Sequence, residues 1–122
     1  MEPPRDQPKD AYDSLLVMGT SDGKVHLLDL TRNKIISTIN LISPDVTVFC
    51  VDWNVEGYLA IASTEKNVMI KKYEPEQKTF YDVTQLGTNC ESRYVCWNSI
   101  RPNLLACGLF NGQIVVFDST TL

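Results

Sequence analysis

The feature that most constrains the fold of this 122-residue chain is a unit that recurs about every 45 residues. The segments TSDGKVHLLD (20–29) and LFNGQIVVFD (109–118) both consist of a polar turn, an alternating apolar stretch and a terminal aspartate. YLAIASTEKNVMIKKYE (58–74) aligns between them as a third, more divergent copy. Self-similarity at a fixed period indicates a repeat architecture in which neighbouring units share a core.

Each unit is built from short apolar runs separated by turn signals. The runs are rich in the β-branched and aromatic residues that strands favour. Asp22-Gly23 and Asn111-Gly112 are strong hairpin signals because their turns need positive φ angles. No segment has a sustained helical period with caps, so we expect almost no helix. The expected strands are 14–20, 24–30, 35–41, 47–54, 58–64, 67–74, 79–86, 93–99, 104–110 and 113–119.

The expected fold class is all-β, a partial β-propeller made of four-stranded antiparallel blades. Successive blades cover about 14–41, 47–86 and 93–119. The first blade starts at its second strand, the middle blade has all four strands, and the last blade ends at its third. Residues 1–13 are polar and rich in proline and acids, which predicts a flexible segment.

Several short motifs make residues 14–122 resemble the WD-repeat β-propeller family. An aromatic residue followed by asparagine closes the first strand of two blades, small residues end the second strands, and an aspartate ends two third strands. These residues are Trp53-Asn54 and Trp97-Asn98, then Met18-Gly19, Ala62-Ser63 and Cys107-Gly108, and finally Leu28-Asp29 and Phe117-Asp118. The last two pairs stand where the family has Trp-Asp.

The chain also departs from the family pattern. No Gly-His dipeptide precedes a first strand, the only histidine is His26, and Lys71-Lys72-Tyr73 replaces Trp-Asp in the middle blade. The buried Asp-His-Ser-Trp network of the family is therefore not expected. Propellers close with four to eight blades. We therefore expect a fragment, a truncated isoform or a piece completed by other blades or chains, with a small stand-alone β-sandwich as the alternative.

Composition and charge argue against several classes of partner. The net charge of −4 and the pI near 4.8 give no basic surface for nucleic acid. Lys66, Lys71 and Lys72 form the only close basic cluster, and acids flank them. No apolar run reaches the ~20 residues of a membrane span. The polar N-terminal segment has no apolar signal region, which predicts an intracellular protein, cytoplasmic or nuclear.

The four cysteines do not have the spacing of a zinc site or of a disulfide framework. Cys50, Cys96 and Cys107 lie in apolar runs and are expected to be buried, whereas Cys90 lies in a polar stretch and is expected to be exposed. The sequence also has no phosphate-binding glycine loop and no nucleophile with a general base. It therefore predicts no catalytic, metal or cofactor site, no small-molecule ligand and no enzyme.

The resemblance implies a binding surface where the loops 20–24, 41–47, 64–67, 85–93 and 109–112 meet. The candidate partner contacts there are Phe110, Arg93, Asn111, Asp22 and Asp45. Aromatic residues and arginines dominate interface energetics, which favours Phe110 and Arg93. Phe110 packed against the next blade, and Arg93 paired with Glu91, are the alternatives. Trp53 and Trp97 are expected to be core anchors, and Asp29 and Asp118 to cap turns.

The function that the resemblance implies is a non-enzymatic protein–protein interaction scaffold or adaptor. Two other roles of such propellers stay open. One is an RNA- or chromatin-associated component, against which the acidity of the chain counts. The other is a substrate receptor of a ubiquitin ligase, although the Trp-Asp-x-Arg variant of such receptors lacks its arginine after both Asp29 and Asp118.

Overall fold

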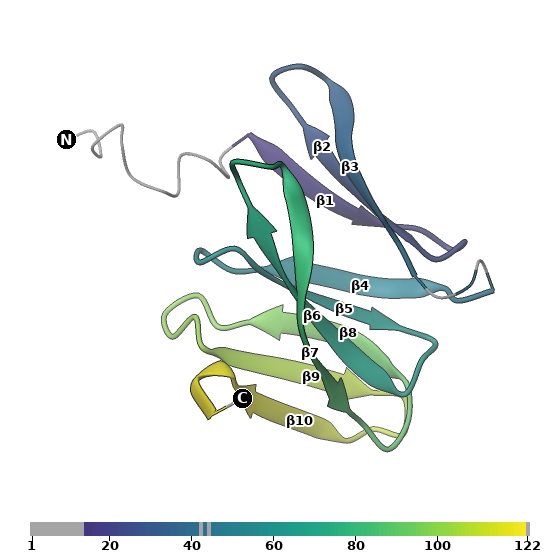
Figure 1. Ribbon diagram of the computed structural model, residues 1–122. Helices are drawn as coiled ribbons and strands as arrows, with labels where there is room; N and C mark the ends of the chain where they lie inside the picture. Colours follow the sequence, from purple (N-terminus) through teal and green to yellow (C-terminus); the bar gives the residue numbers. More distant parts are fainter. Residues whose placement is uncertain (1–13, 42, 44, 122) are drawn as a thin grey trace.

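A computed structural model of the chain describes residues 14–41, 43 and 45–121. It is all-β apart from one short 3-10 helix, Ser119–Thr121, within that range. In this described part of the chain ten strands form three antiparallel sheets. Figure 1 shows how the sheets are arranged. Each sequence-predicted strand is found, with ends that differ by at most two residues. The segment 1–13, predicted to be flexible, lies outside the described residues.

The sheets follow the chain order, and within each sheet every strand pairs with its sequence neighbours. The first sheet has the order β1-β2-β3, the central sheet β4-β5-β6-β7, and the last sheet β10-β9-β8. The strand bounds are Leu15–Gly19 (β1), Lys24–Asp29 (β2), Lys34–Asn40 (β3), Val48–Trp53 (β4), Tyr58–Ser63 (β5), Asn67–Glu74 (β6), Thr79–Gly87 (β7), Ser92–Trp97 (β8), Leu104–Leu109 (β9) and Ile114–Asp118 (β10).

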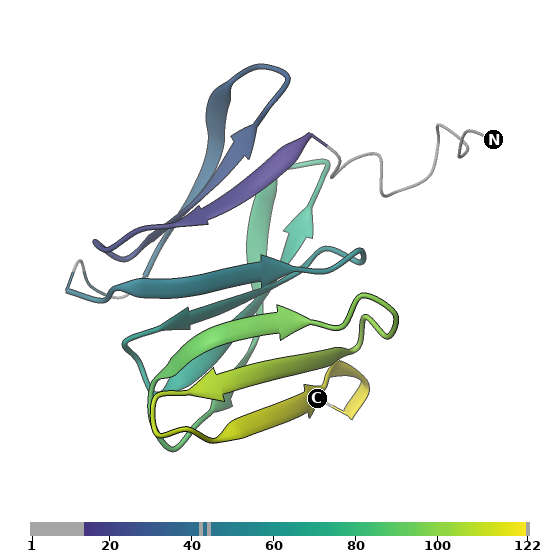
Figure 2. The ribbon, with the colours of Figure 1, turned by 180° about the vertical axis from the view of Figure 1, so that it is seen from behind.

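The three sheets pack face to face, with β4 against both β1 and β8 (Figures 1 and 2). The central sheet is therefore covered on both sides, and β5 is buried on both of its faces. Leu59 and Ile61 join a cluster with Val25 of the first sheet. Ala60 and Ala62 point the other way, into a larger cluster shared with the last sheet. The period-two alternation of one strand thus supplies side chains to two cores.

The central and last sheets are also joined by hydrogen bonds. The backbone N–H of Trp97 donates to Asp52 Oδ2 over 2.8 Å, and its indole Nε1–H donates to the Asp52 carbonyl over 3.1 Å. Asn54 Nδ2 donates to the Pro102 carbonyl over 2.9 Å. Trp97 of one Trp-Asn pair and Asn54 of the other therefore join the central sheet to the last sheet. Trp97 is buried, as predicted, whereas Trp53 is only partly buried and packs against Phe80.

The aspartates that end the repeated unit, Asp29 and Asp118, both cap the turn that follows. Asp29 Oδ1 accepts hydrogen bonds from the Thr31 hydroxyl (2.7 Å) and backbone N–H (2.9 Å). Asp118 Oδ1 accepts the same pair from Thr120, together with the amide of Asn103. The Thr31 hydroxyl lowers the pKa of Asp29, and the Asn103 amide lowers the pKa of Asp118. The prediction that Asp29 and Asp118 cap turns is confirmed.

The outward faces of the first and last sheets carry exposed apolar side chains. Leu16 and Ile35 are about half exposed on the first sheet. On the last sheet Ile114 is 77% exposed and Val116 is 61% exposed. Because Cys96 and Ala106 pair across β8 and β9, and Ala106 and Val116 across β9 and β10, they form one apolar stripe on that face.

The predicted burial of the cysteines is fully confirmed only at Cys107, and Cys50, predicted to be buried, is partly buried. Cys96 is exposed and Cys90 is partly buried, whereas the sequence pattern predicts the reverse. Alternation along β8 buries Val95 and Trp97 against the central sheet, so Cys96 lies on the outward face. Cys90, although its stretch is polar, packs against the larger core cluster. An apolar run does not reveal which of its two faces a neighbouring sheet covers.

Alkylation should separate Cys96 from Cys107. Cys107 is fully buried and burial raises its pKa to about 11, so at pH 8 about one molecule in a thousand carries the reactive thiolate. We expect iodoacetamide at pH 8 to modify Cys96 at least tenfold faster, as measured by peptide mass spectrometry. In denaturant the two rates should converge. Equal rates in the native chain would contradict this packing.

Candidate functional site

The candidate site lies at the end of the sheets where the β1–β2, β5–β6 and β9–β10 turns meet the connectors β3–β4 and β7–β8. Figure 1 shows these loops together on the right. Phe110 follows β9 at this end and is 66% exposed. Among the described residues no neighbouring blade covers the Phe110 ring. Arg93, in β8, is also exposed.

Two β-bulges give the site its shape. The register of β4 with β5 skips Phe49, between Val48 and Cys50. The register of β8 with β9 skips Arg93, between Ser92 and Tyr94. A bulge inserts one unpaired residue and redirects its side chain. Phe49 and Arg93 are thus equivalent residues on the first strands of neighbouring blades.

The bulges bring three side chains into one cluster, which we call the Arg93 clamp: Phe49, Arg93 and Phe110. The Arg93 Cζ atom lies 4.5 Å from the centroid of the Phe49 ring and 5.1 Å from that of Phe110. Each cation–π contact of this kind is worth about 0.5–1 kcal/mol at an exposed site. Arg93 is held by the two rings, so the alternative of an ion pair with Glu91 is not what the structure has.

Hydrogen bonds of Ser92 and of the Phe110 backbone stabilise the segments that carry the clamp. Ser92 is fully buried, and its Oγ lies 3.2 Å from the Tyr94 carbonyl and 3.4 Å from the Gly108 carbonyl, across the bulge. The Phe110 backbone N–H donates to the Glu91 carbonyl over 2.9 Å. This bond ties the β9–β10 turn to the residues just before β8. The clamp is therefore held by ordered backbone on both sides of Arg93.

The other sequence-predicted candidates, Asn111, Asp22 and Asp45, lie in the loops without joining the clamp. Asn111 caps its own turn, with Oδ1 accepting from the Gln113 N–H and Nδ2 donating to Gln113 Oε1, both over 3.1 Å. Asp45 is exposed, and its backbone N–H donates to Ser43 Oγ over 3.1 Å.

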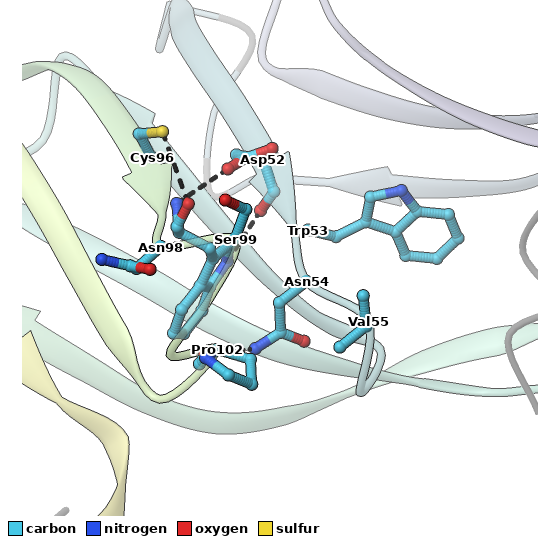
Figure 3. Close-up of a pocket in the computed structure, with 9 residues that line it drawn as sticks. Asp52, Trp53, Asn54, Val55, Cys96, Asn98, Ser99 and Pro102 are labelled. Atoms are coloured by element: carbon cyan, nitrogen blue, oxygen red, sulfur yellow. Dashed lines mark hydrogen bonds between the residues drawn. The ribbon is translucent and has the colours of Figure 1, made fainter.

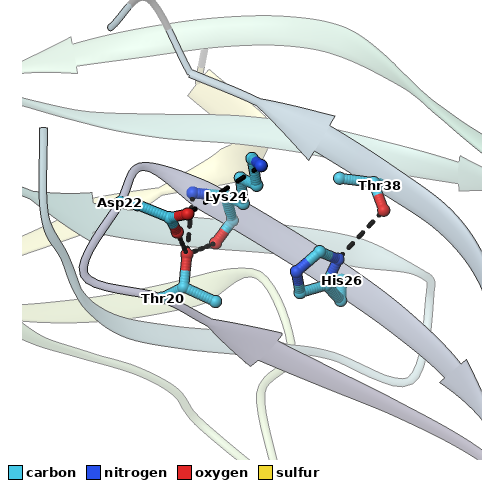
Figure 4. Close-up of polar contacts among 5 residues, drawn as sticks. All are labelled: Thr20, Asp22, Lys24, His26 and Thr38. Carbon is cyan, nitrogen blue, oxygen red and sulfur yellow. Dashed lines mark hydrogen bonds and ion pairs between the residues drawn. The ribbon is translucent and has the colours of Figure 1, made fainter. Parts of the chain in front are cut away.

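Asp22 is occupied by contacts within its own turn, as Figure 4 shows. It accepts a hydrogen bond from the Thr20 hydroxyl, which lowers the pKa of Asp22, and its Oδ2 lies 3.8 Å from Lys24 Nζ. His26, nearby on β2, has its Nδ1 2.9 Å from the Thr38 hydroxyl. The contacts of Asp22 stabilise the β1–β2 turn, and the contact of His26 joins β2 to β3, so Asp22 has a structural role in its own turn.

Phe49 is the member of the clamp that sequence reasoning missed. It stands in the run TVFCVDWN, where it looks like any other apolar strand residue. The signal that finds it is the repeat itself. When Trp53-Asn54 is aligned with Trp97-Asn98, Phe49 falls on Arg93. Equivalent residues of first strands lie side by side because neighbouring blades pack in the same orientation.

A cavity of about 340 Å³ lies at the opposite end of the strands, between the central and last sheets. Asp52, Asn54 and Pro102 line it, together with the Trp97 ring (Figure 3). Asp52 Oδ2 accepts a hydrogen bond from the Trp97 backbone N–H. The Asn54 amide donates to the Pro102 carbonyl and accepts from the backbone N–H groups of Glu56 and Tyr58. The cavity therefore lies at the contact between two blades, and these polar groups hold the two blades and the β4–β5 turn together.

Within the described residues no group of three or more His, Cys, Asp or Glu side chains is placed to hold a metal ion. No helix in the same part of the chain is long and apolar enough to cross a membrane. The site is thus defined by an arginine, two aromatic rings and their loops.

Comparison with solved structures identifies the architecture. The β-propeller domain of Cps50 (Swd1) from Myceliophteria thermophila superposes with a TM-score of 0.72 over 92% of this chain, at 17% sequence identity. This chain has the fold of a partial β-propeller. It spans 32% of the length of that domain. No protein-family profile matches the sequence, and no curated protein matches it.

Proposed function

We propose that this chain is a non-enzymatic protein-interaction scaffold that binds its partner with the Arg93 clamp and the loops around it. The observation that carries the proposal is the clamp itself. Phe49, Arg93 and Phe110 come from three separate segments and meet at one exposed position on a rigid β frame. Aromatic residues and arginine are the types that dominate binding energy at protein interfaces.

The packed strands are suited to holding loops in place for a binding partner rather than to catalysing a reaction. Loops held by packed strands meet a partner in a preorganised form, so less conformational entropy is lost on binding. The propeller likeness supports this role, because such folds carry varied loops on a constant scaffold. The acidic net charge of −4 favours a protein partner over RNA.

We further propose that additional propeller blades, from the same protein or from another chain, cover the outward faces of the first and last sheets. The central sheet, covered on both sides, shows how blades of this chain pack. Ile114 and Val116 on the last sheet are the counterparts of apolar strand residues that are buried at the existing joints. The threefold greater length of the matched propeller supports the same proposal.

A display experiment with Phe110→Ala tests the scaffold role. A random heptapeptide phage library is selected on the immobilised chain, and the enriched peptides are measured by fluorescence anisotropy. We expect Phe110→Ala to weaken them by about tenfold or more, because truncating an aromatic anchor typically removes 1.4 kcal/mol or more. Tyr81→Ala is the matched control, since Tyr81 is an exposed aromatic residue on β7, away from the clamp.

Two results would contradict the proposal. One is a set of enriched peptides that bind Phe110→Ala and wild type equally well. The other is loss of folding in Phe110→Ala, seen as a thermal midpoint lowered as far as that of a core variant. In that case the Phe110 ring would be part of the core and not of a binding surface.

A further inference from the structure

We propose that Arg93 binds the carboxylate of an Asp or Glu side chain in the partner peptide. The inference rests on the proposed scaffold function and names the chemistry that its site recognises. The starting point is the way in which the two phenylalanine rings hold the guanidinium group. They position Arg93 without using any of its hydrogen-bond donors.

The rings of Phe49 and Phe110 lie against the guanidinium, with centroids 4.5 Å and 5.1 Å from Cζ. A cation over a ring face contacts the π system, whereas the five N–H donors of arginine lie in the guanidinium plane. Among the described residues no hydrogen bond or ion pair reaches the Arg93 guanidinium. The N–H donors of the guanidinium are therefore available to a ligand. Two of them can bind the two oxygens of a carboxylate in parallel, in a bidentate pair.

The clamp also prepares Arg93 for binding before a ligand arrives. A free arginine side chain loses much rotamer freedom when it binds, and this loss weakens the complex. Here the bulge, the buried Ser92 and the two rings already restrict the side chain.

The charges of the surrounding loops select among negatively charged ligands. The acids at this end of the sheets are Asp22, Asp45, Glu65 and Glu91. Asp22 is paired with Lys24, Glu65 lies in the β5–β6 turn next to Lys66, and Glu91 lies in the β7–β8 connection two residues before Arg93. Four acids against two lysines, Lys24 and Lys66, leave the loops around Arg93 net negative. Such a border repels a polyanion but accepts an isolated carboxylate in a neutral or basic peptide. The geometry therefore points to an acidic side chain rather than to a nucleic acid backbone.

A nuclear magnetic resonance titration tests this with two blocked peptides, acetyl-GGEGG-amide and acetyl-GGQGG-amide, at constant ionic strength. The peptides differ only in carboxylate against carboxamide. We expect the glutamate peptide to shift the Arg93 Nε–H resonance in a saturable manner. The glutamine peptide should bind at least about tenfold more weakly, because it lacks the charge and one acceptor oxygen.

Variants separate the contribution of the paired N–H donors of Arg93 from that of its positive charge. Arg93→Lys keeps the positive charge and loses the planar donor pair, so we expect the glutamate peptide, followed through the Phe110 amide, to bind about tenfold more weakly. Phe110→Leu keeps Arg93 but removes one ring, and should weaken binding severalfold. Arg32→Lys is the matched control, because Arg32 is exposed in the β2–β3 turn, at the other end of the strands.

Equal binding of the two peptides would overturn the inference, and so would salt-dependent binding of hexauridylate to Arg93, which would make phosphate the ligand. The two proposals can fail separately. If library peptides bind through Phe110 but keep their affinity when each Glu or Asp is replaced by its amide, the scaffold stands and the carboxylate inference falls. If no peptide depends on Phe110, the scaffold proposal itself falls.

Discussion

Trp97→Ala is expected to lower the free energy of unfolding by about 3–5 kcal/mol, a large share of the 5–15 kcal/mol of a typical domain. Trp97 is buried in the cluster shared by the central and last sheets, and its ring centroid lies 6.4 Å from that of Tyr58. Truncation leaves a cavity between two rigid sheets that cannot close it. Urea unfolding followed by circular dichroism measures the loss.

Trp97→Phe separates the two contributions of this residue. It keeps most of the aromatic volume and the backbone bond to the Asp52 carboxylate, but it removes the indole donor to the Asp52 carbonyl. The lost hydrogen bond is worth about 0.5–1.5 kcal/mol and the smaller ring packs less well, so an intermediate loss is expected. A change below 1 kcal/mol in Trp97→Ala would contradict the assignment of Trp97 as the anchor between blades.

The strands of this chain could be predicted because each is bounded by a turn with its own chemistry. Asp22-Gly23 and Asn111-Gly112 require positive φ, and the structure has φ of 79° at Gly23 and 88° at Gly112. The aspartates that end the third strands cap the next turn by short-range contacts. Such features depend on neighbours in sequence, so a single sequence carries them.

The clamp and the burial of Cys96 depend instead on contacts between distant segments. A bulge shifts alternation by one residue, so Arg93 and Tyr94 are both exposed although they are adjacent in β8. Nothing in the run SRYVCW marks that shift. Which face of β8 is covered likewise depends on the central sheet. Sequence reasoning therefore found Arg93 and Phe110 as separate candidates, but not their meeting at Phe49.

Gly23→Ala is expected to destabilise the fold more than Gly112→Ala, although both glycines occupy the same position of the repeated turn. Alanine at either φ is strained, which costs about 1–2 kcal/mol. At Gly23 the new Cβ would also lie 2.6 Å from the Ser43 carbonyl oxygen and 2.9 Å from that of Val46. Both contacts are with backbone, so the β3–β4 connector must shift, which adds about 1–3 kcal/mol.

The comparison with Gly112 bears on the binding surface as well as on stability. At Gly112 a Cβ would meet no heavy atom within 4 Å, so Gly112→Ala should show the backbone strain alone. Gly87→Ala, at an open position without positive φ, is the control and should change stability by less than about 0.5 kcal/mol. Urea unfolding of the three variants measures these differences. The β3–β4 connector covers the β1–β2 turn at Gly23, whereas the β9–β10 turn that carries Phe110 is open at Gly112. If Gly112→Ala lost as much stability as Gly23→Ala, the β9–β10 turn would be covered too, and Phe110 would not be free to meet a partner.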